Sequence, residues 1–308
     1  MEKTILHPRP VFLAGPTAVG KSALALALAE KIGGEIISVD SMQAYRGLDI
    51  GTAKPTAEER HRVPHHLIDI CDLNESFDAA QFVRHAQQAV TEIQARGHVP
   101  IFCGGTGLYF KAFISGLGEA PATDAKIRAE LEATPLETLL QELRERDPET
   151  YEKIDRQNPR RIVRAVEVIR LTGKKFSAQR SEWTPDSRPQ TPDPSFYCFT
   201  RPAEELHQRI NIRVDEMFAR GLVEETRELL KHGLAENKYA LQAIGYRQVV
   251  EHLRGEHSLA ETIELVKVRT RQFAKRQLTW FRRHANCEWI ELGADETMER
   301  VLGRIART

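Results

Sequence analysis

The segment from Gly15 to Ser22 has the residue types and spacing of a phosphate-binding loop. It contains Gly15, Pro16, Thr17, Ala18, Val19, Gly20, Lys21 and Ser22, which together satisfy the pattern G-x-x-x-x-G-K-[ST]. The glycines let the backbone curl so that successive N–H groups point at phosphate oxygens, and a following helix N-terminus adds partial positive charge. Lys21 can neutralise phosphates, and the Ser22 hydroxyl can bind Mg²⁺. The alternative, a tight turn with a solvated lysine, fits the pattern less well. The motif alone does not identify the phosphorylated ligand.

Two further polar segments follow runs of strand-forming residues. Asp40 lies in Ser38-Val39-Asp40-Ser41-Met42-Gln43, and Thr106 lies in Gly104-Gly105-Thr106-Gly107. Open α/β sheets bind ligands at the carboxyl ends of their strands, so both segments could join the phosphate loop in one site. Each has an alternative interpretation. Asp40 could cap a helix or support Mg²⁺ indirectly, and Thr106 could be the N-cap of a helix after a simple turn.

The elements that would position these residues alternate between strand and helix. Short apolar runs predict strands, and Ala- and Leu-rich stretches predict helices, which Gly33 and Gly97 end. Ser76 is the expected cap of the second helix. This alternation is typical of a parallel α/β sheet. The predicted strands are Val11–Ala14, Glu35–Val39 and His98–Cys103, and the predicted helices are Lys21–Lys31 and Phe77–Ala95.

The pattern changes between residues 120 and 194, which predict a helical insertion domain. Helix starts are expected at Thr134-Pro135, with Glu137 in a capping box, at Asp147-Pro148, and at Asn158-Pro159 in a helix that Gly173 ends. Residues 184–194 contain four prolines and no other apolar residue, which is linker composition. We therefore expect an α/β core of residues 1–119 and 195–308. Its second half would contain strands at 195–200 and 287–292 and a helix capped by Ser258.

The formal net charge is zero, with 44 basic and 44 acidic side chains, but the charges are unevenly placed. Residues 156–180 contain eight Lys or Arg and one acid, Glu167. Residues 267–283 contain seven Lys or Arg and no acid, interleaved with Phe273, Trp280 and Phe281. A plain interpretation makes the cations a solvated surface and the aromatics core. Together, the two blocks also suit phosphate contacts and base stacking on a single-stranded RNA loop.

The composition also indicates in which cellular compartment the protein works. The four cysteines at 71, 103, 198 and 287 form no C-x-x-C motif, and the first ten residues do not have the composition of a secretory signal. No run of about 18 apolar residues could span a bilayer. We expect a cytoplasmic protein with buried free thiols and no membrane partner. The adjacent histidines 65 and 66 predict local packing, and Asp69 only faintly resembles a Walker B acid.

Several motifs, taken in their order along the chain, resemble the tRNA dimethylallyltransferase family. The resemblance covers about residues 11–281, and the DSMQ and GGTGLY segments are far more specific than the phosphate loop. It implies a P-loop NTPase-like parallel sheet core with a helical insertion. The motifs are GPTAVGKS (15–22), SVDSMQ (38–43), GTAKP (51–55), PHH (64–66), GGTGLY (104–109), NPRR (158–161) and AIGYR (243–247).

The resemblance implies transfer of a dimethylallyl group from dimethylallyl diphosphate to N6 of the adenine immediately 3′ of the anticodon. Asp40 would accept the amine proton, Thr106 would orient a substrate, and Lys21 would act on the leaving group. The diphosphate would be held by residues 15–22 and by Arg213, and Ser22 would bind Mg²⁺. The implied tRNA contacts are Asp40, Ser41, Met42, Gln43, Thr106, Arg128, Gln157, Asn158, Pro159, Arg160, Arg161, Gln242, Ala243, Ile244, Gly245, Tyr246, Arg247, Lys275, Arg276, Gln277, Leu278, Thr279, Trp280, Phe281 and Arg282.

Two other functions share part of this pattern. A small-molecule or nucleoside kinase would have the phosphate loop and could use the insertion as a lid, but it has no obvious use for two basic blocks. A non-catalytic RNA-binding module would have the basic blocks and a phosphate loop without function. The sequence leaves the tRNA set, hydroxylated donors and the order of binding open. A monomer is expected, because the helical insertion of a single chain could close over one stem-loop like a clamp.

Overall fold

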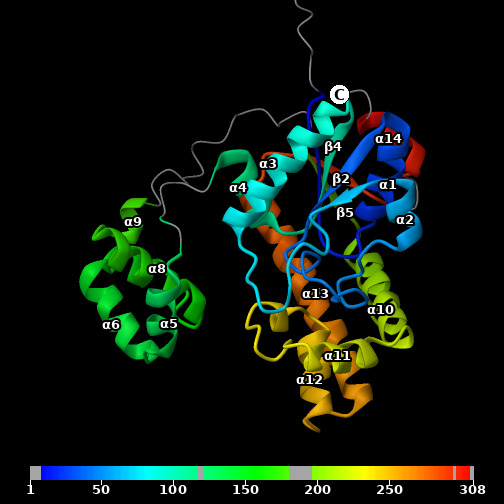
Figure 1. Cartoon of the computed structure of the whole chain (residues 1–308). Coiled ribbons are helices and arrows are strands. Elements are labelled where there is room, and N and C mark those ends of the chain that lie inside the picture. Colours follow the sequence, from blue (N-terminus) through cyan, green and yellow to red (C-terminus); the bar gives the residue numbers. More distant parts are fainter. Residues whose placement is uncertain (1–7, 117–120, 122, 180–195, 294–295, 306–308) are drawn as a thin grey trace, which may run out of the picture. The chain divides into compact units, whose positions relative to one another are not determined.

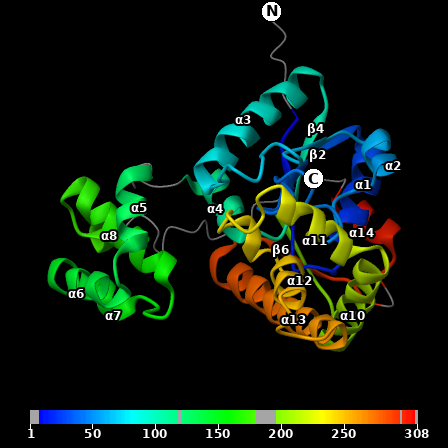
Figure 2. The same cartoon turned by 60° about the horizontal axis from the view of Figure 1, so that its bottom comes forward.

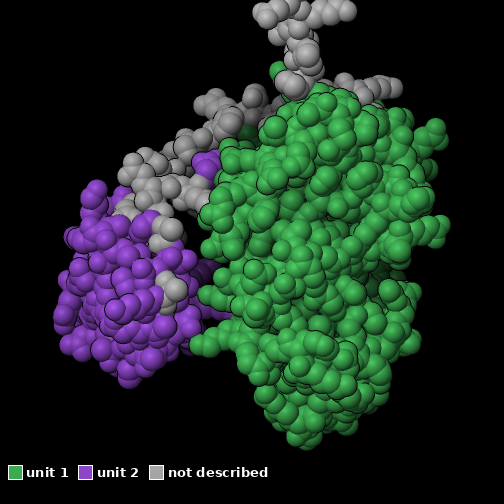
Figure 3. All heavy atoms as spheres, in the orientation of Figure 1, with its two compact units in different colours: residues 1–114, 189–308 green, residues 115–188 purple. Residues whose placement is uncertain are grey.

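The computed structural model describes residues 8–116, 121, 123–179, 196–293 and 296–305. The chain divides into two compact units, one made of Met1–Ile114 with Pro189–Thr308 and the other of Ser115–Arg188 (Figure 3). The boundaries expected from the sequence, 119/120 and 194/195, lie at residues outside the described ranges. Each unit is described by itself below.

Unit 1 is built on a parallel sheet of six strands in the order β3-β2-β4-β1-β5-β6. The strands predicted from apolar runs are confirmed. The two-residue β3 was not predicted, because two histidines are too short to form a recognisable strand pattern. The strands are β1 (Val11–Ala14), β2 (Gly34–Val39), β3 (His65–His66), β4 (Val99–Gly104), β5 (Phe196–Thr200) and β6 (Glu288–Glu291).

The strand order gathers the polar segments of the sequence at one edge of the sheet. β1 lies between β4 and β5, with Ala14 opposite Gly104 on one side and Cys198 on the other. Val39, at the end of β2, is also opposite Gly104. The carboxyl ends of β1, β2 and β4 therefore lie at the same level. Because β1 has β4 on one side and β5 on the other, the connections on its two sides run in opposite directions along the sheet. Such a switch point is where open α/β sheets bind their ligands.

Helices cover both faces of the sheet, as Figure 1 shows. Alternate residues of the strands enter two separate hydrophobic clusters, as the period of two in a strand requires. One cluster joins the sheet to α3 (Ala79–Ala95), α4 (Gly107–Ser115) and α12 (Tyr246–Leu253). The other joins it to α1 (Lys21–Ile32), α10 (Ala203–Ala219) and α14 (Met298–Ile305). Short helices α2 (Ala57–Arg62), α11 (Leu222–Lys231) and η3 (Ala240–Gln242) complete the described part of this unit.

The long helix α13 (Leu259–His284) contributes to both clusters. Val266 and Ala274 pack in the cluster of α1 and α10, whereas Phe281 is fully buried in the cluster of α3 and α4. Burying a phenylalanine side chain contributes about 1.5–3 kcal/mol. Helix α10 packs against α13, and the two lie side by side in Figures 1 and 2. This pair later supplies one wall of the site.

The helix ends confirm some sequence predictions and correct others. Ser258 caps α13 in a capping box with Glu261, as predicted. The predicted cap of α3 was wrong, because Asp78 caps that helix and its carboxylate accepts the N–H of Gln81 at 2.9 Å. The box predicted at Thr134 was also wrong. The Thr134 hydroxyl donates backward to the Glu130 carbonyl at 2.9 Å, so it belongs to the end of the preceding helix.

Unit 2 is a helical bundle with a core of its own. Its helices are α5 (Ala125–Ala133), α6 (Leu136–Arg146), α7 (Pro148–Lys153), α8 (Pro159–Thr172) and α9 (Phe176–Gln179). Asp147 and Asn158 cap α7 and α8, and Gly173 ends α8, as predicted. The apolar face of α8 is buried among leucines of α5 and α6. The buried Asp147 carboxylate also accepts hydrogen bonds from Thr150 and Ser177, which ties α7 to α9.

Candidate active site

The predicted phosphate loop connects β1 to the N-terminus of α1. Gly15 has a φ of 153°, and a Cβ there would lie 2.8 Å from the Phe199 carbonyl oxygen, so only glycine fits. Gly20 has a φ of 108° and precedes the first helical residue, Lys21. The loop is thus curled around the positive end of a helix dipole, which is an arrangement suited to anions.

Lys21 lies inside this loop. Its Nζ donates to the Pro16 carbonyl at 3.0 Å. Burial lowers the pKa of the Lys21 ammonium from its ordinary value; Cys103 opposes this shift, and the nearby charge of Arg213 adds to it. A cation that has lost hydration in this way gains more from an anionic ligand than a solvated one does. The position and the lowered pKa of Lys21 are therefore suited to binding a phosphate group.

Two arginines that the sequence analysis missed hold the outside of the loop. Arg201 Nε donates to the Val19 carbonyl at 2.7 Å, and Arg209 Nε donates to the Ala18 carbonyl at 2.9 Å. Both contacts join residues more than 180 positions apart in the chain, so no local motif could show them. They hold the Ala18 and Val19 carbonyl groups of the loop in place.

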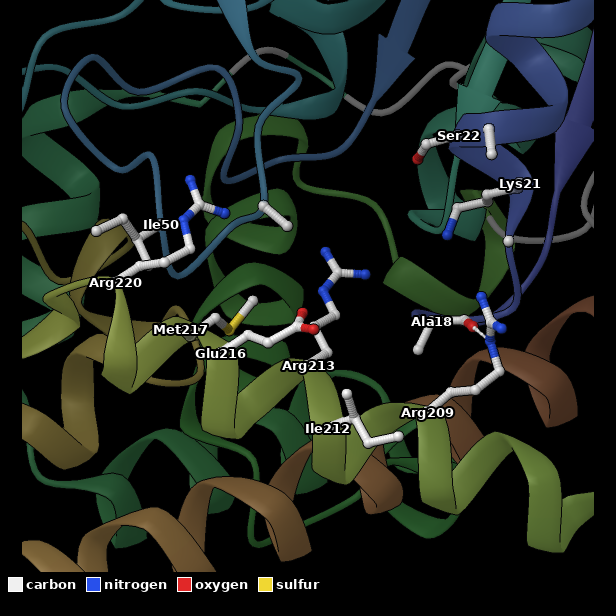
Figure 4. Close-up of a pocket in the computed structure, with 13 residues that line it drawn as sticks. Ala18, Lys21, Ser22, Ile50, Arg209, Ile212, Arg213, Glu216, Met217 and Arg220 are labelled. Atoms are coloured by element: carbon white, nitrogen blue, oxygen red, sulfur yellow. Dashed lines mark hydrogen bonds between the residues drawn. The ribbon is translucent and has the colours of Figure 1, made fainter.

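A pocket of about 400 Å³ opens beside the loop (Figure 4). Its polar wall combines Lys21 and Ser22 with cationic side chains of α10, among them Arg209 and Arg213. Apolar side chains share the lining, including Met217, which Figure 4 shows on the same helix face as Arg213. The pocket therefore suits a molecule with a strongly anionic end and a small apolar portion. Arg213, which the resemblance suggested as a diphosphate ligand, lies at this pocket.

A second pocket, of about 340 Å³, contains Asp40 and Thr106. Asp40 Oδ1 accepts the N–H of Met42 at 2.9 Å and that of Gln43 at 3.4 Å, so the carboxylate shapes its own loop. The Thr106 hydroxyl oxygen accepts the N–H of Ser41 at 3.3 Å. Thr106 is therefore not simply a helix cap, because it ties the loop after β4 to the loop after β2.

The two pockets adjoin at α10, because Arg213 and Met217 line both of them. These residues are four positions apart, which places them one above the other on a single helix face. Burial lowers the pKa of the Arg213 guanidinium, and the charge of Asp40 opposes that shift. Lys21 and Asp40 also interact electrostatically. The phosphate side and the carboxylate side thus form one site with a shared wall.

The predicted RNA-binding segments of unit 1 divide into exposed and buried residues. Gln242, Arg247 and the α13 residues Lys275, Arg276, Thr279 and Arg282 are exposed, and Trp280 and Leu278 are partly exposed. Gln242, Ala243, Ile244 and Arg276 also line the second pocket, together with Phe273. Three side chains face inward instead. Tyr246 and Phe281 are fully buried, and Gln277 is 7% exposed, so these three stabilise the fold rather than present a surface.

Unit 2 also departs from the simple basic face expected from its sequence. Gln157, Pro159, Arg160 and Arg161 are exposed near the start of α8. Arg128, whose contact with tRNA stays a prediction, pairs with the buried carboxylate of Glu167, whose oxygens lie 3.2 Å from Nε and 2.5 Å from Nη2. Arg164 shares that carboxylate, and Arg170 pairs with Glu130 and Glu142. Two of the eight cations in residues 156–180, Arg164 and Arg170, are therefore paired with carboxylates of the bundle.

The two histidines make local contacts, as the sequence suggested, and Asp69 forms ion pairs within the protein. His66 Nε2 lies 2.6 Å from a Glu35 carboxylate oxygen, and His65 Nδ1 lies 2.8 Å from the Val63 carbonyl. The carboxylate of Asp69 pairs with Lys54 and Arg60. Within the described residues, no three His, Cys, Asp or Glu side chains form a group that could hold a metal ion. No helix in the described ranges is long and apolar enough to cross a membrane.

A parallel sheet with a phosphate loop at its switch point, and a carboxylate pocket beside that loop, defines a P-loop α/β protein. Comparison with known proteins narrows this class. A family model described as IPP transferase matches residues 43–284. The tRNA dimethylallyltransferase of Geobacter metallireducens is 47% identical over 305 residues, covering 96% of this chain and 97% of that protein. The tRNA dimethylallyltransferase 1 of Trichlorobacter lovleyi is 47% identical, covering 92% and 94%.

Solved structures agree with these relatives. A tRNA isopentenylpyrophosphate transferase from Bacillus halodurans is 40% identical, with a TM-score of 0.70, and covers 98% of this chain and 96% of its own. A eukaryotic dimethylallyltransferase studied acting on tRNA is 29% identical, with a TM-score of 0.74 over 92% of this chain and 74% of its own. The chain therefore belongs to the tRNA dimethylallyltransferase family, and the family and the P-loop NTPase-like fold expected from the sequence are confirmed.

Proposed function

We propose that this protein transfers a dimethylallyl group from dimethylallyl diphosphate to N6 of the adenosine immediately 3′ of the anticodon in tRNA. The observation that carries the proposal is the pair of adjoining pockets: a cationic phosphate loop on one side of Arg213 and Met217, and Asp40 with Thr106 on the other. Membership of a family whose relatives are named for this activity supports it. A donor with an anionic end and a five-carbon apolar end matches the first pocket.

The chemistry follows from the groups at the junction. A bond forms between the adenine N6 and C1 of the prenyl group, and the bond from C1 to the diphosphate oxygen breaks. The leaving diphosphate gains negative charge, which Lys21, Arg213 and the N–H groups of the phosphate loop stabilise. The amine loses a proton, for which Asp40 is the general base. Thr106 holds the Asp40 loop in place through Ser41.

The residues present suit Mg²⁺ as a partner of the diphosphate. Ser22 is exposed beside Lys21 in the first pocket, and the described residues contain no cluster of acidic metal ligands. Mg²⁺ characteristically takes few protein ligands and completes its shell with substrate phosphates and water. Ser22 Oγ would hold the ion, which when bound supplies positive charge to the leaving group.

The proposed acceptor is the anticodon stem-loop. Gln242 and Arg276 line the second pocket, and the exposed residues Lys275, Arg282 and Arg247 lie near them in sequence. In unit 2, Gln157 and the first three residues of α8, Pro159, Arg160 and Arg161, are exposed. Cations on a surface contact RNA phosphates, and a base extruded from the loop can enter a pocket of this size. The four cysteines are buried free thiols, consistent with a reducing cytoplasm. We expect a monomer, because one chain supplies both pockets.

A transfer assay tests the proposal. Purified protein, Mg²⁺, labelled dimethylallyl diphosphate and an anticodon stem-loop should give labelled RNA, and replacing the target adenine should abolish the label. The matched variant is Asp40→Asn, whose amide oxygen can still accept the N–H groups of Met42 and Gln43. Losing the base should lower kcat by about 10²–10⁴-fold, with little change in KM for RNA.

The opposite result would point to the kinase alternative. If no label enters RNA and the protein instead releases phosphate from ATP or phosphorylates a small acceptor, the phosphate loop binds a nucleotide. If RNA binds but Lys21→Ala changes no measurable activity, the protein is an RNA-binding module. Full transfer activity in Asp40→Asn would retain the reaction but remove Asp40 as its base.

A further inference from the structure

Gln277 belongs to a segment that resembles a tRNA-binding motif, yet its side chain points into the protein. It lies on α13 and is only 7% exposed. Gln277 Oε1 accepts the N–H of Thr17 at 2.9 Å, and Gln277 Nε2 donates to the Gly105 carbonyl at 3.0 Å. One amide group therefore connects the phosphate loop to the loop after β4. Both ends of the amide therefore bind backbone groups of the protein.

The second contact reaches the acceptor side of the site. The N–H groups of Gly105 and Thr106 both donate to the Val39 carbonyl at 3.2 Å, and the Thr106 hydroxyl accepts from Ser41. Ser41 directly follows Asp40. Gln277 thus belongs to a chain of hydrogen bonds between two loops of the site. The chain starts at Thr17 of the phosphate loop, passes through Gln277 to the loop after β4, and ends at Ser41, in the loop of the proposed base. Any shift of the Gln277 amide changes the spacing between the two loops.

The glycines of the loop after β4 are shaped around α13. A Cβ at Gly105 would lie 2.1 Å from Gln277 Nε2, and a Cβ at Gly107 would lie 2.1 Å from the ring of Trp280. An alanine at Gly105 would displace the Gln277 amide, and an alanine at Gly107 would displace the Trp280 ring. The glycines at these two positions are therefore needed for close approach of α13, in addition to the turn that they make. The fit shows that the contact of Gln277 is built into the packing of both elements.

The N–H of Thr17 has a further consequence for the phosphate loop. Because it donates to Gln277, it is not available to a diphosphate oxygen. Thr17 also lines the second pocket and not the first. The resemblance assigned Thr17 to the diphosphate, but its backbone is committed to holding the two loops together. The diphosphate is left to the part of the loop nearer Lys21.

We propose that Gln277 is a positioning residue that sets the distance between the bound prenyl diphosphate and the Asp40–Thr106 side of the site. This inference rests on the proposed transfer reaction and names a new part of its machinery. Displacement reactions are sensitive to such spacing, because a misplacement of about 1 Å can cost 10²-fold in rate. Gln277 touches neither reacting atom and acts through Thr17 and Gly105.

Two substitutions separate positioning from RNA binding. Gln277→Leu removes both hydrogen bonds, and we expect kcat to fall about 10²-fold while KM for the stem-loop changes less than about threefold. Gln277→Glu keeps an oxygen for the Thr17 N–H but cannot donate to the Gly105 carbonyl while ionised. A buried carboxyl has a raised pKa and donates once it is protonated. The activity of Gln277→Glu relative to wild type should therefore rise at least about tenfold between pH 8 and pH 6.

Gln272→Glu is the matched control, because it places the same carboxylate on an exposed position of the same helix. This variant reports the effect of an added negative charge on RNA binding. Its transfer activity relative to wild type should not rise between pH 8 and pH 6. Rates are normalised to the folded fraction at each pH, and wild type is measured at the same two pH values, so neither partial unfolding nor the pH dependence of the wild-type reaction decides the result. A raised KM with unchanged kcat in Gln277→Leu, or a flat pH ratio in Gln277→Glu, would overturn the inference. Absence of transfer in the wild type would instead overturn the proposed function.

Discussion

Replacing Glu35 should destabilise the fold without touching the chemistry. Glu35 lies on β2 opposite Pro100 of β4, near the amino ends of both strands, and is 2% exposed. Arg96 donates to both of its carboxylate oxygens, at 2.9 and 2.8 Å, and His66 and His98 lie 2.6 and 2.7 Å away. The active-site loops follow the opposite ends of these strands. Glu35→Gln should therefore lower stability while kcat of the folded protein is retained.

The magnitude follows from the pKa of Glu35. Burial by itself raises that pKa, but the hydrogen bonds from Arg96, His66 and His98 outweigh burial and lower it from 4.5 to about 2. A shift of about 2.5 units corresponds to roughly 3 kcal/mol of folding free energy. Because the folded-state pKa is lowered, this contribution is complete well above pH 4.5 and is lost as the pH falls towards 2. At pH 3 about 1.4 kcal/mol should remain.

Urea unfolding followed by circular dichroism measures both quantities. The free energy of unfolding of Glu35→Gln should be about 2–3 kcal/mol lower than that of wild type at neutral pH, and the difference should shrink between pH 5 and pH 3. The control is Glu30→Gln, which breaks a surface pair with Arg62 and should cost at most about 1 kcal/mol. If the two variants lose equal stability at pH 7, or if their pH dependences coincide, the reasoning about Glu35 is refuted.

Other substitutions test the site and the two units. Lys21→Ala should lower kcat for transfer by at least about 10²-fold through lost stabilisation of the leaving group, as steady-state kinetics would show. Met217→Ala removes apolar volume from the wall that the two pockets share and should raise the geranyl-to-dimethylallyl ratio of kcat/KM about 10-fold, whereas Met298→Ala, at an exposed position that lines neither of these pockets, should not. Tyr246→Phe removes a hydroxyl that donates to Glu225 and accepts from Gly51, so it should cost about 1–3 kcal/mol by urea unfolding with unchanged RNA affinity. Glu167→Gln removes the buried negative charge that Arg128 and Arg164 share and should destabilise unit 2 by about 3–5 kcal/mol, seen as an earlier transition of its helices.

The parts of the fold that sequence could predict are those set by local patterns. The phosphate loop is recognisable because its glycines, lysine and serine act within eight consecutive residues. The strands of the sheet were recognisable as apolar runs between turn residues, and Asp147, Asn158 and Ser258 cap helices as their positions suggested. In each case the physical cause and the pattern occupy the same short stretch of chain.

The missed features arise from contacts between distant residues. Arg201 and Arg209 support the phosphate loop, but nothing in their own surroundings indicates a partner near residue 18. The spacing of Arg209 and Arg213, one helical turn apart, could have suggested a shared cationic face. Likewise, a motif that resembles an RNA-binding segment does not reveal which of its side chains face inward. Gln277 and Phe281 are four positions apart on the buried side of α13, whereas Arg276 and Thr279 are exposed.

The separate core of unit 2 has a consequence for how this protein could be altered. Its leucines and isoleucines pack among themselves, and its buried carboxylates Asp147 and Glu167 are satisfied by residues of the same unit. Such a segment does not depend on the sheet for its hydrophobic burial or for its buried hydrogen bonds. We therefore expect that an insertion from a relative can replace unit 2 (residues 115–188) while the phosphate loop and the Asp40 pocket of unit 1 keep their own packing.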